Sequence, residues 1–168
     1  AIRYAADAGA KIISLSLGGS RTETPGAMPC PQGEQDAIIY AIGKGAVVVA
    51  ASGNSGQAGS PVEDPAVCLG VVSVGAVDSQ NRVAAFSSRH PFLTVTAPGV
   101  KIPTLSRIPG VAYKGDGTSQ VTALTSAALA VVWSKYPTLT GRQVVARLLA
   151  TIDRSSTTRD PAYGFGII

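Results

Sequence analysis

Gly117, Thr118 and Ser119 have the clearest chemical potential in this sequence, because they lead into a long run of small and apolar residues that is typical of a helix. A hydroxyl at the start of a helix lies beside free backbone N–H groups and the positive end of the helix dipole. Such a place suits a nucleophile whose reaction develops an oxyanion. Ser119 can also be an ordinary N-cap, since serine and threonine are among the commonest capping residues. Taken alone, the stretch favours the cap.

Asn54 is a second polar residue with a possible chemical role. It follows an apolar run over residues 46–51 that has the length of a buried strand. The Asn54 amide can donate one hydrogen bond to an oxyanion and the Ser119 N–H can donate a second, while the Ser119 hydroxyl attacks a carbonyl carbon. The alternative is that Asn54 is a turn residue, a position where asparagine is frequent.

Two segments at predicted strand ends could hold an extended peptide beside these groups. Ligands of open α/β sheets bind beyond the carboxyl ends of the strands, and backbone exposed there can pair with a peptide by strand addition. The predicted substrate-binding residues are Ser16, Leu17 and Gly18 after the first strand and Ala51, Ser52 and Gly53 after the second.

The elements that must position these residues alternate between strands and helices. Residues 12–17 and 46–51 are predicted strands, and residues 34–44 between them have helical periodicity. Strand, helix and strand in this order imply a right-handed crossover and a parallel sheet. We also expect helical turns over residues 1–8, strands at 69–76 and 92–97, a hairpin over 101–114, and helices over 119–136 and 140–152. The predicted fold is α/β, with three layers in which helices cover both faces of a mostly parallel sheet.

The composition fits one densely packed domain and narrows its function. Of the 168 residues, 45% are hydrophobic and 14% are charged, which argues against disorder. The net charge of +4 comes from scattered basic residues, so nucleic acid is not an expected partner. No glycine-rich phosphate-binding motif follows a strand, which disfavours a nucleotide-binding domain. The carboxylates are dispersed and there is one histidine, so neither a metal site nor a cofactor is predicted.

Cys30 and Cys68 leave two alternatives open. In a cytosolic protein they would be free, buried thiols, whereas in an exported protein they would form a disulfide. We favour the disulfide, which would stabilise the fold by roughly 4 kcal/mol in the chain-entropy model.

An ordered set of short motifs runs along the whole chain. The set comprises Ser14-Leu15-Ser16-Leu17-Gly18, Ala50-Ala51-Ser52-Gly53-Asn54, Pro65-Ala66-Val67, Val71-Val72-Ser73-Val74-Gly75-Ala76, Phe86-Ser87-Ser88, Ala97-Pro98-Gly99 and Gly117-Thr118-Ser119. In order and approximate spacing this set resembles the subtilisin-like serine proteases. Gln120, the cysteine pair and Ser134-Lys135-Tyr136-Pro137 are more similar to the mycosin branch, which comprises actinobacterial proteases associated with type VII secretion.

The resemblance implies a serine endopeptidase in which Ser119 is the nucleophile and Asn54 supplies the oxyanion-hole side chain. Residues 16–18 and 51–53 would then form walls of the primary specificity pocket, and the ligand would be a peptide or protein substrate. Most family members follow the serine with Met-Ala-x-Pro, whereas this chain has Gln120-Val121-Thr122-Ala123. Proline pre-sets the first turn of a helix, and we expect its loss to be tolerated.

The family's aspartate and histidine motifs, Asp-Ser/Thr-Gly and His-Gly-Thr, are not in this sequence. In the family both lie upstream of the region that this chain resembles. His90 matches no catalytic position, and its context predicts an exposed loop histidine. Without a general base the chain alone should be nearly inactive, since losing one triad member costs roughly 10⁴ in rate.

We therefore expect residues 1–168 to be the C-terminal portion of a single catalytic domain, with a fold that is incomplete at its N-terminal side. Its first partner would be the missing N-terminal part of the same domain. The expected location is secreted or cell-envelope. Any membrane anchor would lie outside the chain, because no apolar run of spanning length is present. The alternative function is a non-catalytic peptide-binding module that has lost its base.

Overall fold

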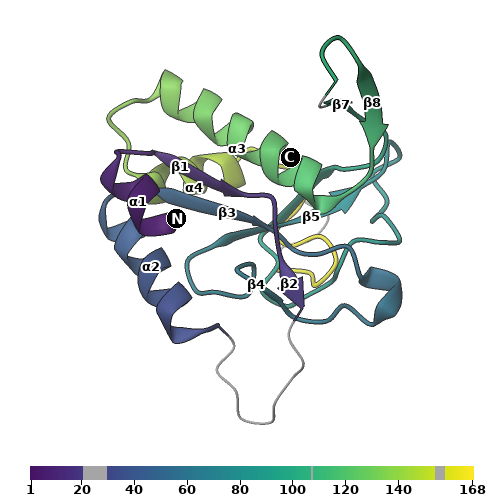
Figure 1. Cartoon of the computed structure of the whole chain (residues 1–168), viewed down its shortest axis with the longest axis horizontal. Coiled ribbons are helices and arrows are strands. Elements are labelled where there is room, and N and C mark those ends of the chain that lie inside the picture. The colour runs from purple at the N-terminus through teal and green to yellow at the C-terminus, as the bar shows by residue number, and fades with distance from the viewer. Residues whose placement is uncertain (21–29, 107, 154–157) are drawn as a thin grey trace.

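A four-stranded parallel sheet forms the centre of the computed structural model, which describes residues 1–20, 30–106, 108–153 and 158–168 (Figure 1). The strands run in the spatial order β1-β3-β5-β6, and each neighbouring pair is parallel. Their bounds are β1 Ile12–Leu15, β3 Val47–Ala51, β5 Val72–Val77 and β6 Val95–Pro98. The predicted α/β fold with a mostly parallel sheet is confirmed.

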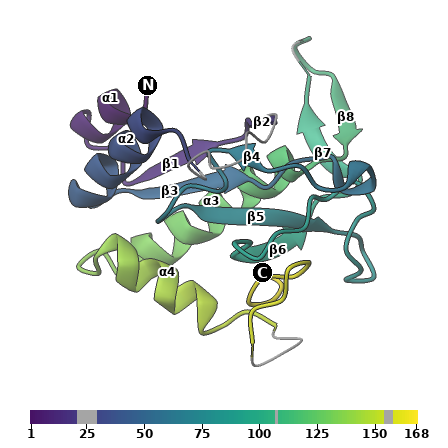
Figure 2. The same cartoon turned by 90° about the horizontal axis from the view of Figure 1, so that it is seen from below.

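Helices cover both faces of this sheet and give the predicted three layers (Figure 2). α1 (Ile2–Asp7) and α2 (Gln32–Gly43) pack on one face. α3 (Thr118–Lys135) and α4 (Gly141–Leu149) pack on the other. In the described part of the chain, none of the helices has the length and apolar character needed to cross a membrane.

β3 is buried along its entire length, as a strand between two helical layers must be. Successive side chains of a strand point to opposite faces of the sheet. Val48 therefore lies in the same core cluster as Ile38 of α2, while Val49 lies in the cluster that includes Leu129 of α3. This two-sided burial explains why residues 46–51 are apolar at every position.

Two short antiparallel ladders lie outside the central sheet. β2 (Gly19–Ser20) pairs with β4 (Glu63–Asp64), and β7 (Ile102–Leu105) pairs with β8 (Ala112–Gly115). The second ladder confirms the predicted hairpin, and it projects from the body of the molecule near the start of α3 (Figure 1). One turn of 3₁₀ helix, η1 (Gly56–Ala58), lies between β3 and β4.

A capping box opens α4, as the Thr140 and Gln143 pattern predicts. Gln143 Oε1 accepts from the Thr140 backbone N at 2.8 Å, and Thr140 Oγ1 accepts from the Gln143 backbone N at 3.4 Å. Two backbone donors that a helix leaves unpaired are thus satisfied. The helix ends at Leu149, a little earlier than predicted.

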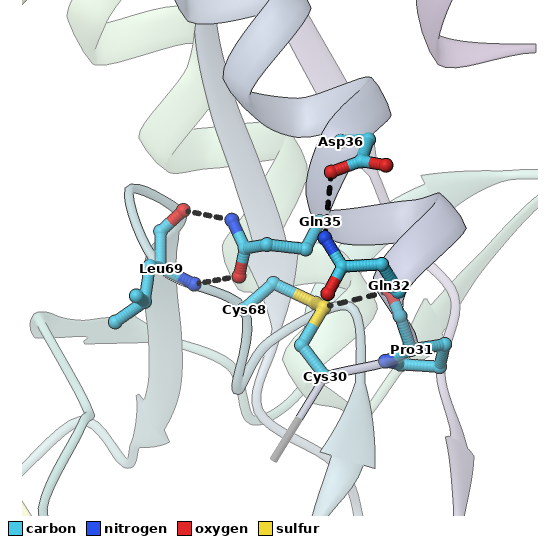
Figure 3. Close-up of a disulfide and its surroundings, with 7 residues drawn as sticks. All are labelled: Cys30, Pro31, Gln32, Gln35, Asp36, Cys68 and Leu69. Atoms are coloured by element: carbon cyan, nitrogen blue, oxygen red, sulfur yellow. Dashed lines mark hydrogen bonds between the residues drawn. A yellow bond between two sulfur atoms is a disulfide. The ribbon is translucent and has the colours of Figure 1, made fainter. Parts of the chain in front are cut away.

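A disulfide joins Cys30 to Cys68 and ties the start of α2 to the segment that follows β4 (Figure 3). The structure thus contains the disulfide rather than two free thiols. Gln35 of α2 reinforces this connection, because its side-chain amide accepts from Leu69 N at 2.8 Å and donates to Leu69 O at 3.0 Å. The bond closes a loop with a sequence separation of 38, for which chain entropy gives a stabilisation of about 4 kcal/mol.

Candidate active site

Ser119 is the second residue of α3 rather than its cap. Gly117 occupies the N-cap position and no side chain caps the helix, so the capping role that the isolated stretch favoured is wrong. The Ser119 hydroxyl instead donates to the Ser16 carbonyl oxygen at 3.2 Å, and the Ser16 hydroxyl donates back to the Ser119 carbonyl oxygen at 3.0 Å. These two bonds join the first turn of α3 to the segment that follows β1.

The Asn54 side chain lies against the start of the same helix. Its Oδ1 accepts two hydrogen bonds from Thr118, one from the backbone N at 2.9 Å and one from the hydroxyl at 3.0 Å. Holding the oxygen fixes the orientation of the whole amide plane. The Asn54 NH₂ then has no partner within the described ranges. Of the first-turn N–H groups of α3, which have no acceptor inside the helix, that of Thr118 is bound to Asn54 Oδ1, whereas that of Ser119 has no printed acceptor among the described residues. The Asn54 NH₂ and the Ser119 N–H can therefore both bind an anionic oxygen.

The parallel register of the sheet brings these groups together at the carboxyl ends of the strands. Leu15 of β1 lies opposite Ala50 of β3, so the segments that follow both strands leave the sheet side by side. α3 starts at the same end of the sheet, where Gly117 N donates to Gly99 O at 2.9 Å just beyond the carboxyl end of β6. Figure 1 shows α3 beginning close to the carboxyl end of β1. The site therefore lies where ligands of open α/β sheets bind.

Ser88 fixes the loop that carries Asn54, and the sequence analysis gave it no role. Its backbone N donates to Gly53 O at 3.0 Å, and its hydroxyl accepts from Ser55 N at 3.2 Å. Its carbonyl oxygen also accepts from the Ser52 hydroxyl at 3.3 Å. Ser88 is completely buried, so these bonds are shielded from water. Its only sequence signal was its place in the Phe86-Ser87-Ser88 motif.

The two predicted wall segments, residues 16–18 and 51–53, face a buried carboxylate. Leu17 is 59% exposed, whereas Ser52 is fully buried. Gly53 has a φ of 110°, a left-handed conformation that favours glycine. Beside Gly53 lies Glu63, which is buried and which the sequence analysis did not single out. Burial raises the pKa of the Glu63 carboxyl above its ordinary value.

A cavity of about 450 Å³ borders Ser119 on the side of the β7–β8 hairpin. Its lining includes Gln120 and Leu124 of α3 and the four residues of β7. The nucleophile candidate is therefore open to a ligand from this side.

The expectation that His90 is an exposed loop histidine is wrong. Its side chain is 4% exposed and stacks on Phe92, with ring centroids 4.5 Å apart and planes inclined by 10°. Burial lowers the pKa of the imidazole. Its backbone N donates to Pro161 O at 2.9 Å, so His90 packs beneath the C-terminal segment. No hydrogen bond links it to Ser119 within the described ranges.

No acid–base partner approaches the Ser119 hydroxyl in the part of the chain that the structure describes; its hydrogen bond goes to a backbone carbonyl. The one cluster of potential metal ligands found among the described residues has its ligand atoms within 4.8 Å of one another and comprises Cys30, Glu34, Asp64 and Cys68. Its two sulfurs are bonded to each other, and a metal needs the thiolate form. The cluster is a disulfide flanked by carboxylates.

Comparison with known proteins decides the family. The model of the Subtilase family, Peptidase S8, matches residues 1–166. The chain belongs to the subtilase family. Among relatives of this subtilase, Subtilisin DY of Bacillus licheniformis is 40% identical over 153 residues, which cover 89% of this chain and 52% of that relative.

Other similarities support the mycosin-type branch of the subtilases. Mycosin-4 of Mycobacterium tuberculosis is 32% identical over 195 aligned residues, covering 100% of this chain and 42% of that protein. The solved structure of the MycP3 protease from the type VII (ESX-3) secretion system has a TM-score of 0.84 and 31% identity, over 99% of this chain and 54% of that one. The subtilase chain thus spans about half the length of these relatives.

Proposed function

We propose that this subtilase chain supplies the nucleophile and the oxyanion hole of a serine endopeptidase that hydrolyses peptide or protein substrates. One arrangement supports this above all others. Thr118 holds the Asn54 amide beside the first turn of α3, and this turn carries Ser119. Membership of a family of subtilisin-like serine proteases supports the same function.

In the proposed reaction, Ser119 Oγ attacks the carbonyl carbon of the scissile bond and passes its proton to a general base. The carbonyl oxygen becomes an oxyanion, which accepts hydrogen bonds from the Asn54 NH₂ and the Ser119 N–H. When the tetrahedral intermediate collapses, the C–N bond breaks and the base returns the proton to the leaving amine. Water then attacks the acyl-serine ester through the same steps and releases Ser119.

The general base and its carboxylate partner, a histidine and an aspartate, come in this proposal from polypeptide outside these 168 residues. Residues 1–168 would be the C-terminal portion of one catalytic domain. The position of β1 supports a missing part of the domain, because β1 is an edge strand of the described sheet and pairs only with β3. Its other side presents backbone N–H and C=O groups that can pair with a further strand.

A secreted or cell-envelope location belongs to the same proposal. The Cys30–Cys68 disulfide supports it, because disulfides persist in oxidising environments. The similarity to mycosin-4 and MycP3 supports a link to type VII secretion. A membrane anchor, if the whole protein has one, would lie outside the chain.

A fluorophosphonate probe tests the proposal by reacting with an activated serine. In the full-length parent protein we expect it to label Ser119 and to leave the Ser119→Ala variant unlabelled. Ser126→Ala is the matched control, since it removes a buried, unpartnered hydroxyl from the same helix and should preserve labelling. The isolated 168-residue chain should react hardly at all. Strong labelling of that chain would contradict the external base.

A non-catalytic peptide-binding module is the alternative, favoured by one observation. The Ser119 hydroxyl is engaged with the Ser16 backbone and with no base in the described part of the chain. The coding sequence upstream separates the two functions. Asp-Thr-Gly and His-Gly-Thr motifs there support the enzyme, and their absence supports the binding module.

A further inference from the structure

His90 is a buried titratable residue that has no part in the proposed reaction. Its side chain is 4% exposed, and its Nε2 is buried without a hydrogen-bond partner among the described residues. The ring hydrogen-bonds with the Pro61 backbone. Proline has no N–H, so the imidazole donates this bond, and it does so from Nδ1. Protonation would therefore add a second N–H and a positive charge at a place where neither has a partner.

The cations around His90 would oppose its protonation. Arg159 of the C-terminal segment donates to the carbonyl oxygen of Phe92, the residue on which the imidazole stacks, and to that of Leu93. Arg89, the residue before His90, is also cationic, although it is exposed. A protonated imidazole would thus share its surroundings with like charges, which disfavour the charged form.

The two nearby acidic residues have other contacts. Asp160 lies in the C-terminal segment, and its Oδ1 accepts from two backbone N–H groups of its own turn, at 2.7 and 2.9 Å. Glu63 follows Pro61 by two positions, and its carboxylate lies against Gly18 and Gly53. Within the described ranges, no hydrogen bond or ion pair joins either carboxylate to the imidazole. A proton on His90 would therefore lack a counter-charge.

His90 also connects the C-terminal segment to the loop that carries Asn54. Its backbone N donates to Pro161 O at 2.9 Å, in the segment drawn in yellow below β6 in Figure 2. Two residues before His90, the buried Ser88 accepts from Ser55 N at 3.2 Å and so fixes the Asn54 loop. A movement of His90 therefore acts on Ser88, and through Ser88 on the position of the Asn54 amide.

We propose that His90 is a positioning residue for the oxyanion hole and that it makes this hole sensitive to acid. When the imidazole takes up a proton from water, residues 88–90 leave their buried place and release the Asn54 loop. When the proton is lost, the segment closes again. This inference rests on the proposed function for its meaning in catalysis, but the opening itself involves only residues of this chain.

The direction of the effect follows from proton linkage. Burial lowers the pKa of His90 from its ordinary value of 6.5, so the open segment, in which the imidazole meets water, binds the proton more readily than the closed one. Opening becomes more favourable as the pH falls below 6.5, by up to about tenfold between pH 7.5 and 5.5. Glu63 acts in the opposite sense, because burial raises its pKa above 4.5 and its protonation favours the closed structure.

Hydrogen exchange followed by mass spectrometry measures this opening without catalysis. The protein is the full-length parent with Ser119→Ala, from which the proposed nucleophile is absent, so that self-digestion does not interfere. Peptides covering residues 52–60 and 84–93 report on the Asn54 loop and on the segment that holds it. A peptide covering α2, on the opposite face of the sheet from α3, is the internal control.

The expected result is a loss of protection confined to the two reporter peptides. After correction for intrinsic exchange rates, their protection should fall by up to about tenfold from pH 7.5 to 5.5, while that of α2 stays the same. His90→Asn keeps a donor for the Pro61 carbonyl and does not titrate, so it should have equal protection at both pH values. His90→Gln is a second neutral variant with the same expectation, and circular dichroism at pH 7.5 verifies that both are folded. Glu63 is common to all three proteins, so its titration cancels in the comparison.

The outcomes separate the two proposals. Equal protection at both pH values with His90 present, or the same acid-induced loss in the neutral variants, overturns the role of His90 and leaves the endopeptidase standing. A loss that extends equally to α2 means general unfolding and also overturns it. A full-length protein that neither cleaves peptides nor reacts with a fluorophosphonate at Ser119 overturns the endopeptidase. The exchange measurement then still decides whether His90 controls the Asn54 loop.

Discussion

Thr118→Val tests whether the fixed orientation of the Asn54 amide makes the oxyanion hole. Thr118 is fully buried and donates to Asn54 Oδ1 from its backbone N at 2.9 Å and from its hydroxyl at 3.0 Å. Valine nearly matches the shape of threonine and removes only the hydroxyl bond. The backbone bond remains, so the amide is held less firmly without being released.

The expected loss follows from the energy of one hydrogen bond. A neutral bond contributes about 1 kcal/mol, which corresponds to a roughly fivefold lower kcat. KM should change little, because the amide acts on charge that develops in the transition state. Asn54→Ala removes the donor itself and should lower kcat by on the order of 10² to 10³. Steady-state hydrolysis of a peptide by the full-length protease measures both variants.

Thr125→Val is the matched control. Thr125 is also fully buried in α3, but its hydroxyl has no hydrogen-bond partner among the described residues. The variant should leave kcat unchanged and raise the midpoint of thermal unfolding, since an unpaired buried hydroxyl is destabilising. The reasoning is refuted if Thr118→Val has the same kcat as Thr125→Val, or if it loses as much as Asn54→Ala.

Three further variants probe the supports of the site. Ser88→Ala should lower both kcat and the free energy of unfolding, the latter by about 1–2 kcal/mol, because the Ser55 N–H loses its acceptor; unchanged kinetics would mean that the loop needs no such support. Replacing Cys30 and Cys68 together by serine should lower the free energy of unfolding by about 4 kcal/mol in a urea titration. Because burial raises the pKa of Glu63 above 4.5, its ionisation opposes folding at neutral pH and ceases to do so as the pH falls below 4.5. Glu63→Gln should therefore raise the midpoint of thermal unfolding at pH 7 and leave it nearly unchanged at pH 4, whereas an equal gain at both pH values would contradict a charge effect.

The sequence predicted the parts of the fold that local patterns encode. The apolar run over 46–51 identified β3 because both faces of the strand are covered, and Thr140 with Gln143 identified the start of α4 because a capping box needs only neighbouring residues. The association of Ser119 with Asn54 also came from the sequence, through chemistry and family resemblance.

Long-range contacts account for what sequence analysis missed. Ser88 reaches the Asn54 loop across more than thirty positions of the chain, and no local pattern encodes that contact. His90 is buried because Phe92 and the C-terminal segment pack around it. The sequence pattern favoured Ser119 as the N-cap because it could not fix the first residue of the helix. In the structure the helix starts at Thr118 and Gly117 is the N-cap. Glu63 was not singled out because its contacts with Gly18 and Gly53 join different segments of the chain, and no local pattern encodes them.

The disulfide also changes what a single cut would do to this molecule. Cys30 and Cys68 close a covalent ring that contains both Asn54 and Glu63, and residues 57–59 form an exposed stretch between these two. A peptide bond broken there opens the ring without separating the chain into two molecules. The nicked protein keeps the part that carries Asn54 and the part that carries Ser119 at high effective concentration, and it runs as two fragments only after reduction. A disulfide of this kind holds the parts of a nicked chain together as well as stabilising the intact fold.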